Sequence, residues 1–231
     1  MDNDQCIIFD LDSTLIRTFT SDEIKKLQEA QIFDDPKYMD VRSRFYSFDI
    51  TSIDDRGNID QERVIGVTRP HLKQFLSYCE RRFNKKTFVY TAATRKYGHG
   101  IINSIFEQEP LILYSREQCV GNEYKLEKPI EKMIKEVDGL NKYMNMSNAF
   151  IIDDRRCSIN PNPDNGILIP AYEPEPNYES IRSNDDALLQ LIDWFEKDYV
   201  KKCKDVRQIY KGDIFAQSGS ENYYTRNIEY K

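Results

Sequence analysis

A run of four bulky, apolar residues near the start of the chain, Cys6–Phe9, constrains its fold more than any other feature. A strand made of these residues has two apolar faces, and such strands are typical of parallel sheets that helices cover on both sides. Residues 86–90 and 149–152 predict two further strands of this kind, with apolar residues at helical spacing between them. The sequence therefore predicts an α/β fold with three layers, α/β/α, around a mostly parallel sheet.

Polar residues follow each of these predicted strands. In chain order they are Asp10 and Asp12, then Thr91, then Asp153 and Asp154. The carboxyl ends of parallel strands meet at one edge of a sheet, where α/β proteins bind their ligands, so these side chains are expected to share a site. Any one of the acidic pairs taken alone would equally suit a turn or a surface ion pair.

The order of these motifs resembles that of the haloacid dehalogenase (HAD) superfamily phosphatases. Residues 10–14 match the Asp-x-Asp-x-Thr signature of the superfamily. The sequence is similar to the FCP/SCP type in particular, whose members dephosphorylate the carboxy-terminal domain (CTD) of RNA polymerase II. Residues 68–76, 89–97 and 153–155 resemble later motifs of that family. The resemblance extends over residues 5–210 and implies a Rossmann-like HAD fold with an insertion that contains a β-hairpin.

The resemblance also implies a role for each motif residue. Asp10 would be the nucleophile that forms an aspartyl-phosphate, and Asp12 the general acid and base. A lysine in the third motif would neutralise the phosphoryl group; we expect Lys128, and Lys125 is the alternative. The implied catalytic residues are Asp10, Asp12, Thr91 and Lys128, and the implied phosphate-binding residues are Thr14, Thr91, Lys128 and Asp153.

The implied chemistry calls for a metal ion, because a carboxylate that attacks a phosphate dianion needs positive charge nearby. Mg²⁺ suits a site of oxygen donors, with water molecules completing an octahedron. The expected ligands are the carboxylates of Asp10 and Asp154 and the backbone carbonyl of Asp12. No other cofactor is expected.

Composition excludes several other classes of protein. The net charge of −6 and the sequence pI of about 5.2 argue against direct binding of nucleic acid. No apolar run is long enough to span a membrane, and residues 1–4 lack the features of a signal peptide. The five cysteines are an odd number with no close pair, a pattern typical of reduced thiols in an intracellular protein. The expected location is therefore intracellular, cytoplasm or nucleus, with the nucleus inferred only from the family's substrate.

The predicted organisation is a single domain, residues 1–211, followed by a polar tail, residues 212–231. An insertion is expected at about residues 18–67. It would hold a helix that Thr20 and Glu23 cap and that runs to about Ala30. It would also hold a hairpin of residues 45–50 and 62–67 around a turn at 54–58. Near the end, Ser183 is expected to open a helix whose apolar face comprises Leu188, Leu191, Ile192, Phe195 and Tyr199.

The leading prediction is thus a Mg²⁺-dependent protein serine/threonine phosphatase acting on phosphopeptides like those of the RNA polymerase II CTD. Phe45, Tyr46 and Phe48 are candidates for a wall of the peptide groove, although aromatic residues at every second position of a strand more often pack inward. One alternative is a HAD phosphatase of a small molecule or a nucleic-acid end. Another is a catalytically silent phosphopeptide- or protein-binding module.

Overall fold

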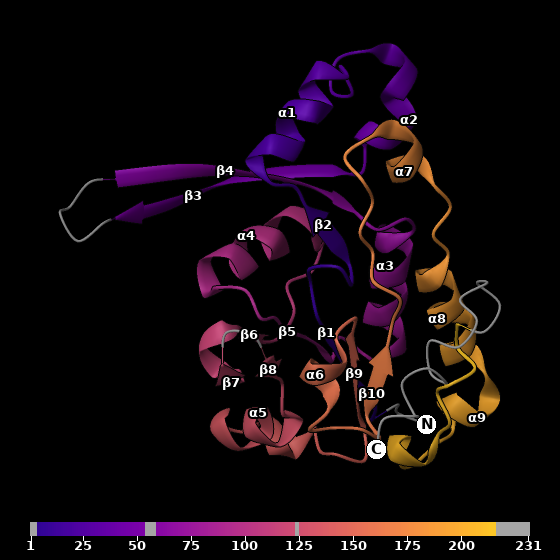
Figure 1. The fold of residues 1–231 in the computed structure, drawn as a ribbon. Coiled ribbons are helices and arrows are strands. Elements are labelled where there is room, and N and C mark those ends of the chain that lie inside the picture. Colours follow the sequence, from indigo (N-terminus) through magenta and orange to yellow (C-terminus); the bar gives the residue numbers. More distant parts are fainter. Residues whose placement is uncertain (1–3, 54–58, 123–124, 216–231) are drawn as a thin grey trace.

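The structure is a computed structural model that describes residues 4–53, 59–122 and 125–215. Its centre is a sheet of five parallel strands (Figure 1). The strands lie in the order β10 (Gly166–Leu168), β9 (Ala149–Asp153), β1 (Cys6–Phe9), β5 (Thr87–Tyr90) and β6 (Leu113–Tyr114). β1 is therefore central: Ile8 lies opposite Ile151 of β9 on one side and Phe88 of β5 on the other. The prediction of an α/β fold around a parallel sheet is confirmed.

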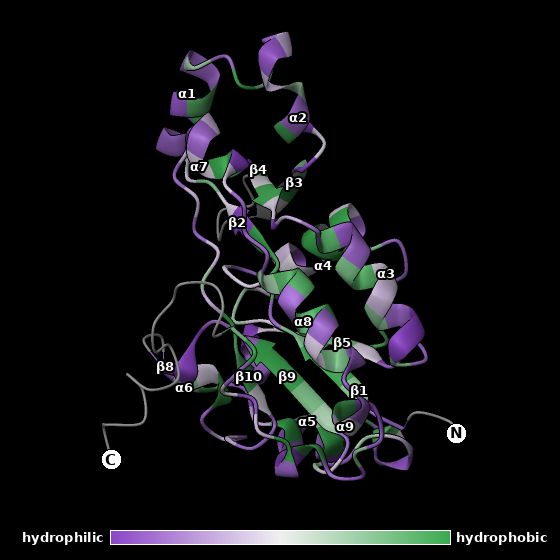
Figure 2. Cartoon of the chain, turned by 90° about the vertical axis from the view of Figure 1, so that its right-hand side faces the viewer, coloured by the Kyte–Doolittle hydropathy of each residue, from purple (hydrophilic) through white to green (hydrophobic). Residues whose placement is uncertain are grey.

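Alternate residues of the strands face two separate cores. Ile7 and Phe9 face helices α3 (Leu72–Arg82), α4 (Arg95–Ile105) and α8 (Ala187–Glu196). Cys6 and Ile8 face the other side, where α5 (Ile130–Glu136), α6 (Arg156–Ile159) and a 3₁₀ turn (Leu140–Lys142) lie. Figure 2 shows the apolar strands β1 and β9 between these helical layers. The two cores explain why β1 is apolar on both faces.

A second, antiparallel sheet has the order β2 (Ile16–Thr18), β4 (Ile59–Thr68) and β3 (Phe45–Ile53). β3 and β4 pair from Phe45↔Val67 to Ile53↔Ile59, so the predicted hairpin is confirmed and is longer than expected. Its turn lies outside the described residues. Figure 1 shows this hairpin extending beyond the central sheet. A small core of its own joins the sheet to α1 (Ser21–Glu29), α2 (Met39–Arg42), α7 (Tyr178–Arg182) and the 3₁₀ turn Pro36–Tyr38.

The helix predicted near residue 20 is confirmed in detail. The Thr20 side chain accepts a hydrogen bond from the Glu23 amide, and the Glu23 carboxylate accepts one from the Thr20 amide. This reciprocal pair satisfies two amides that the first turn of a helix would otherwise leave without a partner. α1 ends at Glu29, one residue before the expected end.

The helix predicted to begin at Ser183 is wrong in its bounds. Ser183 instead caps the carboxyl end of α7, and α8 begins at Ala187 after its N-cap Asp186. The helix then breaks at Lys197, which places Tyr199 in the short α9 (Asp198–Lys201). Tyr199 is 51% exposed and is not part of the apolar face. The predicted buried residues Leu188, Leu191 and Phe195 do lie in the core.

The remaining elements of the described residues are short. They are the 3₁₀ turns Arg116–Gln118 and Val206–Gln208 and a small hairpin of β7 (Val120–Asn122) and β8 (Lys125–Glu127). None of the helices in the described ranges is long and apolar enough to cross a membrane.

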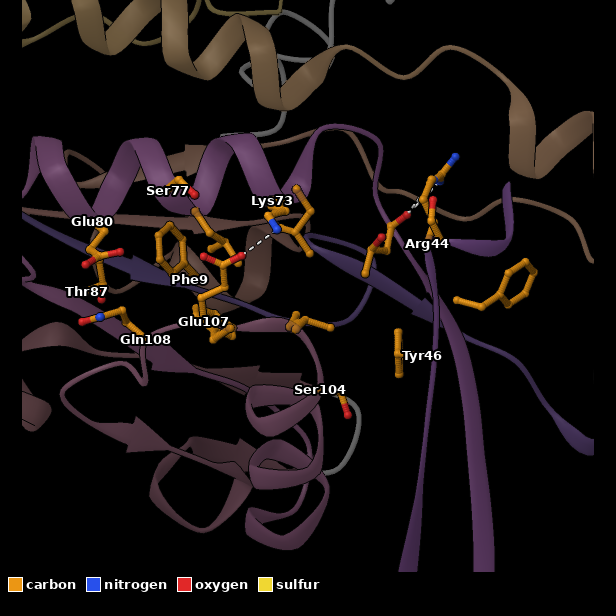
Figure 3. A pocket seen from close by; sticks show the side chains of 17 residues that line it. Phe9, Arg44, Tyr46, Lys73, Ser77, Glu80, Thr87, Ser104, Glu107 and Gln108 are labelled. Carbon is orange, nitrogen blue, oxygen red and sulfur yellow. Dashed lines mark hydrogen bonds and ion pairs between the residues drawn. The ribbon is translucent and has the colours of Figure 1, made fainter. Parts of the chain in front are cut away.

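A cavity of about 300 Å³ lies on the side of the sheet covered by α3 and α4 (Figure 3). Apolar side chains including Phe9, Leu72 and Leu76 line it. Lys73 and Glu107, which are both largely exposed, form an ion pair of 2.8 Å at its rim. This cavity contains none of the acidic residues that follow β1 and β9, so it is separate from the site described next.

Candidate active site

Asp10 lies where β1 reaches the edge of the central sheet. Its amide still donates to the carbonyl of Ile152 at 2.9 Å, so the backbone pairing with β9 continues to this residue. Asp10 is only 5% exposed. Because the sheet holds the backbone of Asp10, its carboxylate is positioned at the carboxyl ends of the strands, as the sequence predicted.

Lys128 joins Asp10 to Asp153. Its ammonium lies 2.5 Å from Asp10 Oδ1 and 2.6 Å from Asp153 Oδ2. Burial alone would lower the pKa of Lys128, but the charges of Asp10 and Asp153 outweigh burial and raise the pKa above its ordinary value. Lys128 is therefore a cation at neutral pH, held between two carboxylates.

The segment around Lys128 is fixed by hydrogen bonds to the region of α6. The Lys128 amide donates to the carbonyl of Ser158 at 2.9 Å. The side chain of Asn162 donates to the Lys128 carbonyl and accepts from the Ile130 amide, both at 2.8 Å. Asn162 thus holds both sides of the short link between β8 and α5, and the orientation of Lys128 follows from this link.

Asp153 and Asp154 follow β9 but differ in their surroundings. Both oxygens of Asp153 are engaged, one by Lys128 and the other by the Arg155 amide at 2.8 Å. Burial raises the pKa of Asp153 to about 6, and the Lys128 ammonium opposes this, so the carboxyl is ionised at neutral pH. Burial, then the charges of Asp10 and Asp153, raise the pKa of Asp154 to about 7. The site therefore has an excess of negative charge.

Thr14 connects the turn after β1 to Asp154. Its hydroxyl oxygen accepts a hydrogen bond from the Asp154 amide at 3.1 Å. The same oxygen lies 3.4 Å from Asp10 Oδ2 and 3.4 Å from Asp154 Oδ1. A hydroxyl has one proton, so Thr14 donates to one of these carboxylates at a time. Thr14 thereby holds the ends of β1 and β9 in register at the site.

Asp12 is oriented by a residue of α4. Tyr97 donates a hydrogen bond to Asp12 Oδ1, and the two oxygens lie 2.5 Å apart. Burial raises the pKa of Asp12 to about 6, although the hydrogen bond from Tyr97 acts in the opposite direction. Burial, followed by the charge of Asp12, raises the pKa of Tyr97 well above its ordinary range, so Tyr97 remains a neutral donor.

A cavity of about 300 Å³ opens among these residues at the carboxyl edge of the sheet. Asp10, Asp12, Thr91, Lys128 and Asp154 all line it. Asp153, which is fully buried, does not line the cavity but contacts Lys128. The Thr91 hydroxyl accepts from the Ala93 amide at 3.1 Å, which fixes its side chain at the cavity wall.

The carboxylates of Asp10, Asp153 and Asp154 could hold a divalent metal ion, since one oxygen of each lies within 4.8 Å of the others. Hard oxygen donors of this kind suit Mg²⁺, and their excess negative charge suits any divalent cation. Because Asp153 is fully buried and does not line the cavity, Asp10 and Asp154 are the more accessible ligands. The Asp12 carboxylate faces Tyr97, which leaves the backbone carbonyl as the expected contribution of Asp12.

Of the two candidate lysines, the structure brings only Lys128 to the site. Lys125 is exposed on β8, where its ammonium lies 3.6 Å from Glu127. Arg69, which precedes the expected helix, is buried away from the cavity. It donates to both oxygens of Asp185, at 2.8 and 2.9 Å, and to the Thr14 carbonyl at 3.0 Å.

Several residues at the site had no role assigned from the sequence, among them Tyr97, Asn162 and Arg116, the last of which also lines the cavity. Tyr97 lies three residues after the N-cap Thr94, on the first turn of a helix that begins at the sheet edge. That spacing is a signal that could have indicated it. No local pattern marks Asn162, because its partners lie more than thirty residues earlier in the chain.

The fold and the order of the motifs are those of HAD-type phosphatases. The sequence profile of the NLI interacting factor-like phosphatases matches residues 5–207, and the chain belongs to this family. No curated protein matches the chain significantly.

Two solved structures share the fold. One is described as fission yeast RNA polymerase II CTD phosphatase Fcp1, a variant bound to beryllium fluoride; it is 19% identical, with a TM-score of 0.53. The match covers 82% of this chain and 49% of that one. The other, described as Fcp1, an essential RNA polymerase II CTD phosphatase, is 16% identical with a TM-score of 0.53. That match covers 90% of this chain and 58% of the other, so this chain spans about half the length of these structures.

Proposed function

We propose that this protein is a Mg²⁺-dependent protein serine/threonine phosphatase that acts through an aspartyl-phosphate intermediate. The observation that carries the proposal is the contact of Asp10 with Lys128, 2.5 Å apart at the edge of a cavity that Asp12 also lines. A buried carboxylate beside a fixed cation and a second carboxylate is the arrangement that nucleophilic attack on phosphorus requires.

In the first step, an oxygen of Asp10 attacks the phosphorus atom in line with the leaving group. The bond from phosphorus to the seryl or threonyl oxygen breaks, and its electron pair stays on that oxygen. Asp12 gives this oxygen a proton, which releases a neutral alcohol. Lys128 neutralises charge on the phosphoryl oxygens, and Asp153 keeps Lys128 in place from behind. Thr91 and Thr14 donate hydrogen bonds to the phosphoryl group or hold the carboxylates around it.

In the second step, water attacks the phosphorus atom of the aspartyl-phosphate. The carboxylate of Asp12, now without its proton, takes one from this water molecule. The bond between phosphorus and Asp10 breaks, its electron pair returns to the carboxylate, and inorganic phosphate leaves. Mg²⁺, held by Asp10, Asp154 and the Asp12 carbonyl, would supply the positive charge that lets a carboxylate approach a phosphate dianion.

We propose phosphopeptides like those of the RNA polymerase II CTD as substrates. Membership of the NLI interacting factor-like phosphatases supports this, as does the fold shared with two structures described as CTD phosphatases. Phe45, Tyr46 and Phe48 stay candidates for a wall of the peptide groove, and Phe45 and Tyr46 line the cavity beside α3 and α4. Phe45 packs on Phe33, and the other two rings stack on each other.

The first test is the release of phosphate from a CTD phosphoserine peptide and from p-nitrophenyl phosphate, with Mg²⁺ and with EDTA. We expect Asp10→Asn to abolish Mg²⁺-dependent release from both, because it removes the nucleophile. Asp22→Asn, on the exposed surface of α1, is the matched control and should leave both rates unchanged.

The outcomes separate the alternatives. Release from p-nitrophenyl phosphate without release from any phosphopeptide would favour a phosphatase of small molecules or nucleic-acid ends. The absence of release from both, with binding of the phosphopeptide retained, would favour the silent binding module and would contradict the proposal.

A further inference from the structure

Three hydroxyl groups form a chain that ends at Asp12. The hydroxyl oxygen of Tyr97 lies 2.5 Å from Asp12 Oδ1 and 2.5 Å from the Thr18 hydroxyl. The Thr18 hydroxyl lies in turn 2.7 Å from that of Tyr46. The three residues come from different elements: Tyr97 from α4, Thr18 from β2 and Tyr46 from β3.

The number of protons fixes the direction of this chain. A carboxylate only accepts, so the single proton of Tyr97 points at Asp12. The Tyr97 oxygen must then accept from Thr18, and because Thr18 has used its own proton, its oxygen must accept from Tyr46. Each hydroxyl thus donates toward Asp12, and hydrogen bonds aligned in this way strengthen one another.

Close packing of the aromatic rings holds these hydroxyl groups in place. Tyr46 is 7% exposed, and its ring stacks on that of Phe48 at 6.3 Å between centroids. The rings of Tyr97 and Phe48 meet edge to face, with their centroids 6.0 Å apart. Two glycines leave room for these rings. A Cβ at Gly66 would collide with Tyr46, and a Cβ at Gly100 would collide with the ring of Phe48. The hydroxyls therefore have little freedom to leave Asp12.

We propose that Tyr97 is a positioning residue for Asp12 and that Thr18 and Tyr46 support it from the antiparallel sheet. By donating to Oδ1, Tyr97 leaves Oδ2 as the oxygen that carries the proton to the leaving group and later takes one from water. A neutral hydroxyl suits this task because it can hold the carboxyl group in both protonation states. The inference rests on the proposed function, in which Asp12 is the general acid.

One consequence concerns the second sheet. Two of the three donors, Thr18 and Tyr46, belong to β2 and β3 of that sheet. The insertion therefore takes part in orienting a group in the active site, in addition to any contact that it makes with a substrate.

The test uses two substrates that differ in their need for a general acid. A seryl oxygen must be protonated as it leaves, whereas p-nitrophenolate is a stable anion and needs no proton. For Tyr97→Phe we expect kcat/KM with a phosphoserine peptide to fall about 10- to 100-fold, part of the effect of a general acid. With p-nitrophenyl phosphate it should fall less than about threefold, since the fold and the nucleophile are intact.

Two more variants test whether the effect decreases with distance from Asp12 along the three hydroxyl groups. Thr18→Val keeps the shape of the side chain and removes the second donor, and Tyr46→Phe removes the third. The loss with the peptide should decrease in the order Tyr97→Phe, Thr18→Val, Tyr46→Phe. The matched control is Tyr78→Phe, which removes a tyrosine hydroxyl that donates to Glu196 at 2.8 Å, away from the site. It should change neither rate.

An equal loss with both substrates would mean that Tyr97 has only a structural role, and an unchanged peptide rate would mean that it has none in the reaction; either overturns the inference. Crystal structures of the unaltered chain and of Tyr97→Phe give a readout that does not depend on activity. We expect the Asp12 carboxylate to lose its single orientation in the variant, and an unchanged orientation would contradict the proposal. If the unaltered chain hydrolyses neither substrate, the proposed function fails, and these structures still decide whether Tyr97 positions Asp12.

Discussion

Two buried cations, Lys128 and Arg69, both contact the segment that follows β1, at Asp10 and Thr14, but they have different surroundings. Each is 1% exposed. Lys128 contacts two carboxylates, those of Asp10 and Asp153, and it lines the cavity. Arg69 contacts one carboxylate, that of Asp185, and its third donor is satisfied by the Thr14 carbonyl.

The balance of charge separates the two cations. Arg69 and Asp185 neutralise each other, and the planar guanidinium matches the carboxylate with two parallel hydrogen bonds. The group around Lys128 keeps a net negative charge, to which Asp154 adds. Such an excess destabilises a buried cluster unless a further cation binds. The comparison teaches that a closed, neutral pair leaves no charge unmet, whereas an unbalanced cluster at a cavity keeps negative charge available for a bound cation.

The strongest test of this comparison is Lys128→Met. We expect kcat to fall by about 10² to 10³, as when a preorganised charge that stabilises a transition state is removed. The protein should also lose about 3–5 kcal/mol of unfolding free energy, because Asp10 and Asp153 are left buried without their cation. Phosphate release and urea denaturation measure the two effects. Retained activity would show that Lys128 is only structural.

Arg69→Met should separate stability from activity. We expect a loss of about 3–5 kcal/mol in the urea experiment, since Asp185 loses its partner. At a temperature where the variant is folded, kcat should fall less than about tenfold, which corresponds to about 1.4 kcal/mol at the transition state. A loss of kcat as large as that of Lys128→Met would break the distinction between the two cations.

A smaller effect is expected for Asp185→Asn. The amide oxygen can still accept one hydrogen bond from Arg69, but the charge is lost, so the unfolding free energy should fall by about 1–3 kcal/mol. The side chain of Asp185 is 23% exposed, which allows water to take up part of the loss. A drop as large as that of Arg69→Met would indicate that the charge alone stabilises this region.

The smallest effect is expected for Lys125→Ala. The ion pair of Lys125 with Glu127 is exposed, so its removal should change stability by less than about 0.5 kcal/mol. Phosphate release should remain within about twofold of that of the unaltered chain, which is within the range of a surface substitution. A large loss of activity would indicate that Lys125, and not Lys128, is the lysine of the third motif.

The sequence predicted those features that depend on local pattern. The apolar strands, the acidic residues that follow them and the capping box of α1 were all visible, because each arises from neighbouring residues. Contacts between distant segments were not. Asn162 holds the link at Lys128, and Tyr97 contacts Asp12, through pairings that only the folded topology creates.

The error near Ser183 has a related cause. Serine suits both the start of a helix and its end, and the pattern alone did not distinguish the two. The structure resolves this because Asn177 caps α7 just upstream and Asp186 precedes α8. Tyr199 was wrongly included because the break at Lys197 changes the direction of the chain without a glycine or proline to signal it.

The central position of β1 has a consequence for biosynthesis. β1 is synthesised about 140 residues before β9, its partner on one side, so Cys6 cannot pair with Ala149 until β9 has been made. Until then it presents an open edge and two apolar faces, a combination that pairs readily with other chains. Nascent chains should therefore depend on protection until β9 has emerged, and slow codons before residue 149 would reduce the yield of protein but leave the activity of each finished molecule unchanged.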